Sequence, residues 1–354
     1  MSNKFNFPAK LLPLLSENCN SVICPYGIET VLAMVAEGAS KESLEDILHA
    51  LGFENLDELR ETVLNVQDVR CKAFSSDNSL KLEKGIENLE FLEKFKQIME
   101  ERYNATIEED ASDGKGKLTL CNLANFKAEW LYEMERDTSH ERRFLNSDRT
   151  YSHPAFLSST QDYLYYYKGG KENGEYAYVN AVALPYKLNN ERIPYELVLV
   201  DSNKDLTAEV LENIFSGMKL EECEVVFPEF SIKNEHNLIP IMQHLGAYTL
   251  FSENFPAFDK ITTHPLYASK FWQEAEIEVD KNGTVAKAET YMDDCFIGDY
   301  LNEARRVVFD KPFYYFLRNT TTGEIIFMGK VNQLGNCEKR KPIAVHTMFG
   351  PIYI

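Results

Sequence analysis

Hydrophobic positions follow a helical period in the first part of the chain. Apolar residues recur every three or four positions between residues 6 and 52, as in helices that bury one face. Gly38 ends one such helix, and a second begins near Ser40, with Glu42 close behind it. A third helical pattern covers Leu89 to Tyr103, so this part of the chain is predicted to be mainly helical.

Strand patterns replace the helical ones from about residue 118 onward. Apolar and β-branched runs predict buried strands at residues 118–121, 178–184 and 196–200. Helices first and strands later favour a segregated α+β domain over alternating βαβ units. No repeat or Pro/Gly-rich linker divides the sequence, so we predict a single domain over residues 1–336 and an extension over residues 337–354.

One strand pattern, over residues 276–282, leads directly into Gly283 and a run of small side chains. In an extended conformation, alternate residues of that run point to opposite faces. One face is small or apolar and the other carries the charges, so the segment is suited to entering a sheet. Gly283 supplies the backbone freedom for the chain to reverse at its start. Composition alone favours a simpler interpretation, an ordinary surface loop.

Composition and charge narrow the function classes. The chain has 354 residues, of which 44% are hydrophobic and 26% charged, so it can bury a large core. Its net charge of -19 opposes binding to a phosphate backbone, and we expect no nucleic-acid partner.

Cysteine usage and the first residues bear on location. The seven cysteines show no C-x-x-C spacing, and their odd number cannot all pair internally, which favours free thiols in a reducing compartment. The apolar run from Phe5 to Leu15 is interrupted by Pro8, Lys10 and Pro13 and makes a poor signal-peptide core. No later segment has the apolar length that spans a bilayer, so we expect no membrane association. These features favour the cytoplasm, and an extracellular location stays open for a chain whose leader has been removed.

Motifs for catalysis and metal binding are absent from the sequence. There is no Gly-x-Ser-x-Gly elbow, and none of the seven histidines lies in a His-Glu-x-x-His arrangement. We therefore expect no enzymatic activity, no metal and no cofactor.

Several short motifs occur in one order over most of residues 6–336. They are residues 20–38, Asn122 with Phe126-Lys127 and Trp130, Leu184-Pro185-Tyr186-Lys187, Phe227-Pro228-Glu229-Phe230, Leu245-Gly246-Ala247, residues 276–290 and residues 310–331. Each is weak alone, but in this order and spacing they resemble the serpin family of serine protease inhibitors. The resemblance implies an α+β fold with N-terminal helices, a large central β-sheet, two further sheets and an exposed reactive-centre loop.

Serpins open their central sheet at two polar regions, the shutter and the breach, and the resemblance assigns six residues to them: Cys24, Asn122, Trp130, Glu229, Gln273 and Lys281. Cys24 and Gly27 replace the family's small hydroxyl residues, which leaves a thinner shutter resting on Asn122 and Gln273. Lys281 and Glu229 reverse the charges that the family places there. We expect the ion pair to survive with its charges exchanged, contributing about 1 kcal/mol or less.

The largest departure lies between Tyr103 and Cys121. The family normally inserts there a long helix that lies across the front of the central sheet. Residues 108–117 form only a short acidic stretch, so we predict that this helix is missing. The apolar extension over residues 337–354 fits either the vacated position or an unattached tail.

The resemblance implies a suicide inhibitor in which a protease cleaves the exposed loop and the freed loop inserts as a new central strand. The inserting hinge comprises Gly283, Thr284, Val285, Ala286, Lys287, Ala288, Glu289 and Thr290. About fourteen inserted residues span roughly 45 Å. This movement would pull the attached protease to the far end of the sheet and distort its active site.

Counting the family's usual distance forward from Gly283 places the reactive bond between Ile297 and Gly298. Phe296 lies one residue away, and counting backward from Pro312 gives about Leu301. The three candidates for the residue before the bond are apolar, which favours elastase-like, chymotrypsin-like or subtilisin-like serine proteases, with papain-like cysteine proteases as a further class.

A second hypothesis is a non-inhibitory serpin, whose loop is cleaved as a substrate or binds a partner. Lys287 and Glu289, at positions where the family prefers alanine-like residues, and the missing helix favour it. For either hypothesis we expect a monomer.

Overall fold

The structure is a computed structural model of the chain. It describes residues 3–15, 18–66, 74–83, 89–103, 105–110, 117–137, 142–172, 174–260, 266–284, 304–335, 344–347 and 350–353.

The N-terminal part is helical, as its periodicity predicts. Its elements are η1 (Asn3–Phe5), α1 (Asn6–Leu11), η2 (Leu12–Leu14), α2 (Pro25–Ala36), α3 (Lys41–Leu51), α4 (Leu56–Val66) and α5 (Leu89–Tyr103). Ser40 caps α3 by accepting a hydrogen bond from the Ser43 N–H, and Gly52 ends it in a left-handed conformation. The predicted start near Ser40 and the predicted helix over Leu89–Tyr103 are therefore confirmed.

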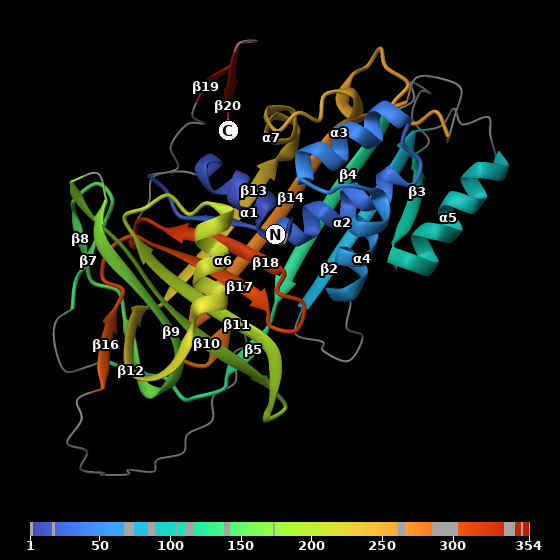
Figure 1. The fold of residues 1–354 in the computed structure, drawn as a ribbon. Coiled ribbons are helices and arrows are strands. Elements are labelled where there is room, and N and C mark those ends of the chain that lie inside the picture. Colours follow the sequence, from blue (N-terminus) through green and yellow to red (C-terminus); the bar gives the residue numbers. More distant parts are fainter. Residues whose placement is uncertain are drawn as a thin grey trace.

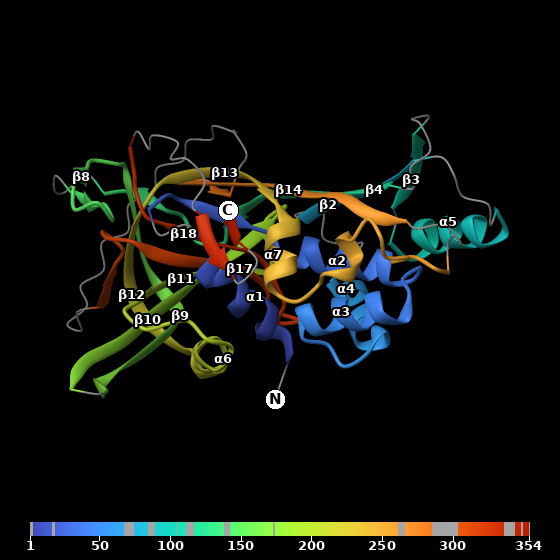
Figure 2. The same cartoon turned by 90° about the horizontal axis from the view of Figure 1, so that it is seen from above.

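Helix α2 lies at the centre of the core, and all twelve of its residues are buried. It packs against α4 and against the strands β4 (Lys117–Phe126) and β18 (Ile325–Val331). Figure 2 shows α2, α3 and α4 on the same side of β2 (Phe74–Glu83), β4 and β14 (Tyr267–Asp280). One face of these strands therefore packs on the helices.

The central strands are hydrogen-bonded along the path β5-β15-β14-β4-β2-β3. Strand β13 pairs with the edge of β14 opposite the one that pairs with β15 and β4. Strands β14 and β4 are parallel and pair from Tyr267–Lys117 to Ala275–Ala124. Their neighbours are β3 (Thr106–Asp110), β5 (Ala128–Trp130), β13 (Phe230–Asn237) and β15 (Gly283–Thr284).

A second group of strands continues the sheet in the order β10-β11-β17-β18-β1, and β9, β12, β16 and β6 extend it from β10. Hydrogen bonds between β10 and β5 join this group to the central strands, so the expected sheets form one connected network (Figure 1). The members are β1 (Ser21–Ile23), β6 (Glu135–Arg136), β9 (Phe156–Glu172), β10 (Glu175–Leu188), β11 (Glu191–Ser202), β12 (Lys219–Pro228), β16 (Arg305–Val308), β17 (Phe313–Asn319) and β18.

Smaller elements complete the described fold. They are α6 (Ala208–Gly217), α7 (Leu238–His244), η3 (Thr249–Phe251) and the two-stranded pairs β7 (Phe144–Leu145) with β8 (Tyr151–Ser152) and β19 (Ala344–Thr347) with β20 (Gly350–Tyr353).

The connection from β3 to β4 is short. Strand β3 ends at Asp110 and β4 begins at Lys117, so only residues 111–116 join them. Six residues are fewer than two helical turns. The predicted loss of a long helix at this place in the chain is therefore confirmed.

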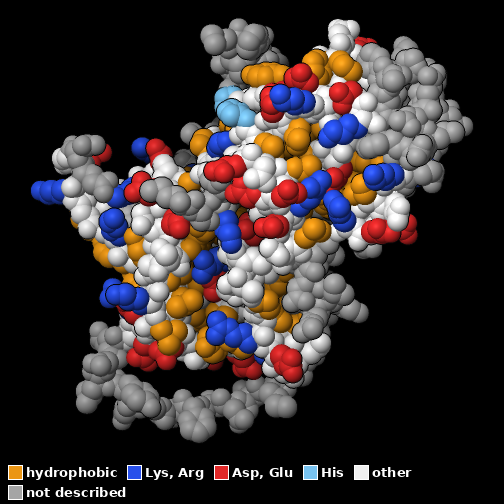
Figure 3. Space-filling model, turned by 45° about the vertical axis from the view of Figure 1, so that its right-hand side comes forward, with side chains coloured by type: hydrophobic (Ala, Val, Ile, Leu, Met, Phe, Trp, Pro, Cys, Tyr) orange, Lys and Arg blue, Asp and Glu red, His pale blue; other side chains and the backbone are white. Residues whose placement is uncertain are grey.

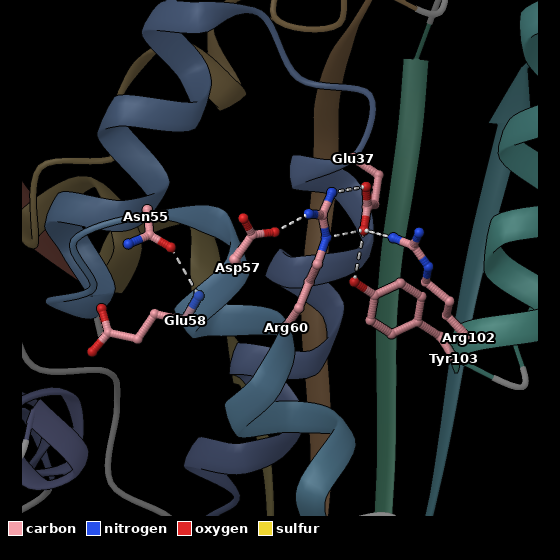
Figure 4. Close-up of polar contacts among 7 residues, drawn as sticks. All are labelled: Glu37, Asn55, Asp57, Glu58, Arg60, Arg102 and Tyr103. Carbon is pink, nitrogen blue, oxygen red and sulfur yellow. Dashed lines mark hydrogen bonds and ion pairs between the residues drawn. The ribbon is translucent and has the colours of Figure 1, made fainter.

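A polar cluster fastens α4 and α5 to the end of α2 (Figure 4). The Glu37 carboxylate accepts hydrogen bonds from Arg60 at 2.8 and 2.6 Å, from Arg102 at 3.1 Å and from the Tyr103 hydroxyl at 3.1 Å. Although burial raises the pKa of Glu37, the hydrogen bonds and charges of these partners lower it below its ordinary value. Elsewhere on this helical side, acidic and basic side chains are interspersed (Figure 3).

A carboxylate within α2, that of Glu29, is buried without such a cluster. Glu29 is 4% exposed, and so is Glu324, just before β18. Burial raises the pKa of Glu29 well above its ordinary value, and the Glu324 carboxyl raises it further. Burial also raises the pKa of Glu324 to about 7, against the opposing effect of Lys4, whose Nζ lies 3.7 Å from its carboxylate. Two acidic groups thus share a dry site next to one ammonium group.

Glu29→Gln is expected to stabilise the native state at pH 8 and to have little effect at pH 5. When burial raises the pKa of an acid in the native state, the native state loses stability as pH rises from the unfolded-state pKa towards the native pKa. The gain at pH 8 should be about 1 to 3 kcal/mol, and the measurement is the midpoint of urea unfolding at each pH. The control is Glu61→Gln, which removes an exposed carboxylate from α4. An equal effect of Glu29→Gln at both pH values would contradict the assignment.

Candidate functional site

Strand β15 forms the beginning of an additional strand at the end of the central strands next to β5. Gly283 and Thr284 pair with Asp280 and Val279 of β14 on one side, and with β5 on the other. Both pairings are antiparallel. From Tyr267 to Ala275 β14 pairs directly with β4, so β15 fills the place where the two neighbouring strands have separated.

Gly283 is required by its position. Its φ of 150° lies in a region that residues with side chains rarely adopt, and a Cβ there would lie 2.1 Å from the Ala128 carbonyl oxygen. The turn before it is held by the Asp280 carboxylate, which accepts hydrogen bonds from the Asn282 and Gly283 N–H groups at 2.7 and 3.1 Å.

Thr284 is fully buried beneath an aromatic pair. Its hydroxyl shares a hydrogen bond of 2.6 Å with the Tyr186 hydroxyl, and the Tyr186 ring stacks on Trp130 with a centroid distance of 4.7 Å. The Trp130 indole N–H donates to the Asp280 carbonyl at 2.8 Å. Trp130 therefore fastens the turn between β14 and β15, while Tyr186 closes the site around Thr284.

Gln273 links β14 to both β4 and α2. Its amide nitrogen donates to the Asn122 side-chain oxygen at 2.7 Å and to the Cys24 carbonyl at 2.9 Å. Its amide oxygen accepts the Cys24 N–H at 2.8 Å. The Cys24 backbone and the side chains of Asn122 and Gln273 are thus brought together, and Gly27 leaves room for Asn122 because a Cβ there would lie 2.3 Å from it.

Two further residues of this network are not among the predicted ones. Asn234 of β13 accepts the Val22 N–H at 2.7 Å, and the His236 ring nitrogen Nε2 donates to the Val22 carbonyl at 2.7 Å. Both side chains lie on the same face of β13 as buried Phe230 and Ile232. Polar residues at core-facing positions of an alternating strand are the signal that identifies them.

The expected ion pair between Glu229 and Lys281 is wrong. Glu229 pairs with Arg136 of β6, whose guanidinium lies 3.2 Å from the carboxylate. Lys281 lies in the exposed turn between β14 and β15, where its side chain meets no carboxylate in the described part of the chain. Strand β6 and the end of β12 pair with the same residues of β9, Leu157 and Ser158, so Arg136 lies close to Glu229, which directly follows β12.

The remaining predicted site residues, 285–290 of the hinge and Phe296, Ile297, Gly298 and Leu301 around the reactive bond, lie outside the described residues.

Four cysteines lie in the described part of the chain, Cys19, Cys24, Cys121 and Cys223, and Cys24 and Cys223 are buried free thiols. Burial raises the pKa of Cys24 far above its ordinary value and that of Cys223 to about 11, so both stay protonated at neutral pH. Among the described residues no three His, Cys, Asp or Glu side chains are grouped to hold a metal ion. Within the same residues no helix has the length and apolar character to cross a bilayer.

Comparison with known proteins decides the family. The family model described as serpin (serine protease inhibitor) matches residues 3–113 and 107–334. The chain belongs to the serpin family. Serpins as a family are protease inhibitors rather than catalytic enzymes.

The similarity of this serpin to individual relatives is low but spans almost the whole chain. It is 23% identical to neuroserpin of Gallus gallus, covering 93% of this chain and 92% of that protein. It is 25% identical to plasminogen activator inhibitor 1 of Neovison vison, covering 89% and 88%. The native-state crystal structure of tengpin, a thermophilic serpin, superposes with a TM-score of 0.78 at 22% identity, covering 94% of this serpin and 93% of tengpin. The predicted α+β serpin fold is thereby confirmed.

Gly283→Ala is expected to expel β15 from its place between β14 and β5, because the added Cβ meets the Ala128 carbonyl. The native state should lose roughly 2 kcal/mol or more, measured as the midpoint of urea unfolding. The matched control is Gly170→Ala in β9, where no atom lies within 4 Å of the added Cβ. Equal midpoints for the two variants would show that β15 does not depend on this glycine.

His236→Gln is expected to protect the native state at acidic pH. Burial lowers the pKa of His236, although the hydrogen bond to Val22 opposes this effect. As pH falls below about 6.5, the unfolded chain takes up a proton that the buried ring resists, so the native state loses stability. The glutamine amide can donate to the same carbonyl without titrating. Unfolding midpoints between pH 7.5 and 5.5 test this, with His244→Gln at an exposed position of α7 as the control, and parallel pH profiles for wild type and His236→Gln would exclude the effect.

Proposed function

We propose that this serpin is an irreversible suicide inhibitor of serine proteases. The observation that carries the proposal is the antiparallel placement of Gly283 and Thr284 between β14 and β5. A strand that continues from Thr284 would run antiparallel between β14 and β4 once these two strands separate. The hinge therefore starts where an inserted strand has to start.

The covalent step takes place on the segment between Thr284 and β16. The protease serine oxygen forms an ester bond to the Ile297 carbonyl carbon, and the bond to the Gly298 nitrogen breaks. The Gly298 amine leaves with the proton that the serine gives up through the protease's own base. Hydrolysis of the ester would release the protease, so inhibition requires that insertion is faster than hydrolysis.

The inserting segment and strand β14 have matching lengths. Residues 284–297 span roughly 45 Å as a strand, and the 14 residues of β14 span about the same length. The new strand would take hydrogen bonds from both neighbours, and its small alternate side chains would face the helices. The native state would then be a kinetic trap from which cleavage releases the loop.

The Gln273 amide controls the separation in this mechanism. Its hydrogen bond to Asn122 crosses from β14 to β4, the two strands that have to part. Its two hydrogen bonds to the Cys24 backbone join β14 to the start of α2, so they do not connect β14 with β4. Opening therefore requires the loss of one buried hydrogen bond between side chains in addition to the backbone ladder.

The target follows from the residue before the reactive bond. Ile297 is the first candidate, with Phe296 and Leu301 as alternatives, and all three are apolar. We propose elastase-like, chymotrypsin-like or subtilisin-like serine proteases, with cysteine proteases of the papain type as the next class. The serpin would act as a monomer that needs no cofactor.

The competing function is that of a non-inhibitory serpin. Lys287 and Glu289 place charges in the inserting segment, and the short β3–β4 connection departs from the family. In that case the loop is cut as an ordinary substrate, or it binds a partner.

Incubation with pancreatic elastase, chymotrypsin and subtilisin is expected to yield an SDS-stable band larger than the 40.7 kDa chain. Thr284→Arg should abolish this band and leave only cleaved serpin, because a charged side chain cannot enter the buried site of Thr284. Thr284→Ser is the matched control, since it keeps the hydroxyl that bonds Tyr186. Only cleaved wild-type fragments with every protease, together with an unchanged melting temperature after cleavage, would reject the inhibitory function and favour the non-inhibitory one.

A further inference from the structure

The face of the central strands opposite α2 carries a column of acidic side chains. Glu274, Glu276 and Glu278 occupy alternate positions of β14, and Glu235 lies beside Glu274 on β13. Lys233 of β13 forms ion pairs with Glu274 at 2.7 Å and Glu276 at 3.7 Å. One lysine among four carboxylates leaves this part of the face negatively charged.

Two large apolar side chains continue the column on the same face. Trp272 is 37% exposed and Leu123 is 41% exposed. Trp272 is the residue before Glu274 on this face of β14, and Leu123 of β4 pairs with Glu274 in the sheet register. The apolar pair and the acidic column therefore form one continuous surface, the front face.

The described residues place no helix or strand over the front face. The helices α2, α3 and α4 lie on the other side of the sheet (Figure 2), and residues 111–116 are all that connects β3 to β4. Exposed tryptophan and leucine side chains next to a charged column are typical of a surface that binds a polypeptide.

The C-terminal segment leaves the body on the helix side of the edge strand β13. The Asn332 N–H donates to the Asn20 side-chain oxygen at 2.8 Å, and two residues further along the chain Val22 is bonded to Asn234 of β13. Among the described strands, β13 pairs only with β14 and forms an edge of the sheet. Asn234 faces the helix side of β13, and the Leu334 N–H donates to the Asn146 side-chain oxygen at 2.9 Å. The segment beyond Gly335 therefore starts on the helix side of this edge strand and passes around it to reach the front face.

The same segment has the complementary chemistry. Lys339, Arg340 and Lys341 form a basic run, and the predominantly apolar residues 342–354 follow it. In the structure, strands β19 and β20 pair only with each other. An isolated two-stranded hairpin is marginally stable in water, so it gains from a surface to pack on.

We propose that residues 337–354 dock across the front face, with the basic run on the acidic column and residues 342–354 over Trp272 and Leu123. Eighteen residues reach up to about 60 Å, which exceeds the roughly 46 Å length of β14. Because the segment is tethered to the same chain, its effective concentration at the face is of millimolar order, enough to populate a weak contact. The inference is independent of the proposed inhibitory function.

Trp272 reports the docking, because the other tryptophan of the chain, Trp130, is only 2% exposed. Acrylamide quenching of the full chain is compared with that of K339E/R340E/K341E, and the Trp272→Phe variant supplies the Trp130 background. We expect the quenching constant of Trp272 to rise about twofold in the triple variant. Combining that variant with E274K/E276K/E278K, which exchanges the charges, is expected to restore the protection.

Controls separate docking from general effects of charge. K168E/K171E/K219E makes the same change in net charge at exposed positions on other strands and should leave the quenching of Trp272 unchanged. Melting temperatures confirm that each variant is folded. Equal quenching in the full chain and in K339E/R340E/K341E would overturn the proposal. Protection that disappears on dilution would also overturn it, because the segment would then come from a second copy.

Discussion

The hydrogen bonds of one buried amide hold the central part of this serpin together. Gln273 satisfies both of its polar groups at once, through Cys24 at the start of α2 and Asn122 on β4. Since the site is fully buried, any partner removed would leave a polar group without water or protein to replace it. The most buried helix, the strand β14 and its neighbour β4 are consequently positioned by the same side chain. The register of β14 on β4 places Gln273 directly opposite Asn122 and so permits this connection.

Other parts of the core bury acidic side chains at a cost in free energy. Glu29 and Glu324 are buried close to one another, whereas Glu37 has three partners that donate hydrogen bonds to it. Burying two acids together is a defect that a fold selected only for stability would avoid. In a protein whose proposed mechanism depends on a native state above its lowest free energy, such a defect is compatible with function.

Much of the fold could be predicted from the sequence because the relevant forces are local. Ser40 and Gly52 mark the ends of α3, and α5 occupies the residues that its periodicity indicates. The helical pattern over residues 6–52 does not extend to α4, although Leu59 and Val63 are buried there at helical spacing. The partners of Glu229 and His236 could not be predicted, because both are determined by strands that meet only in the folded sheet. The motif resemblance indicated which residues belong to the site, whereas their hydrogen bonds depend on the geometry of β6, β13 and β14.

The placement of β15 has a kinetic consequence. Starting a new strand in a sheet is the slow part of strand addition. The segment has to reach its neighbouring strands, and it loses conformational entropy before the first hydrogen bonds offset that loss. In this serpin that search is already complete, because Gly283 and Thr284 are held in register. The strand would then grow by pairing one residue after another, starting from Thr284. Its speed would be governed by how fast two neighbouring strands come apart.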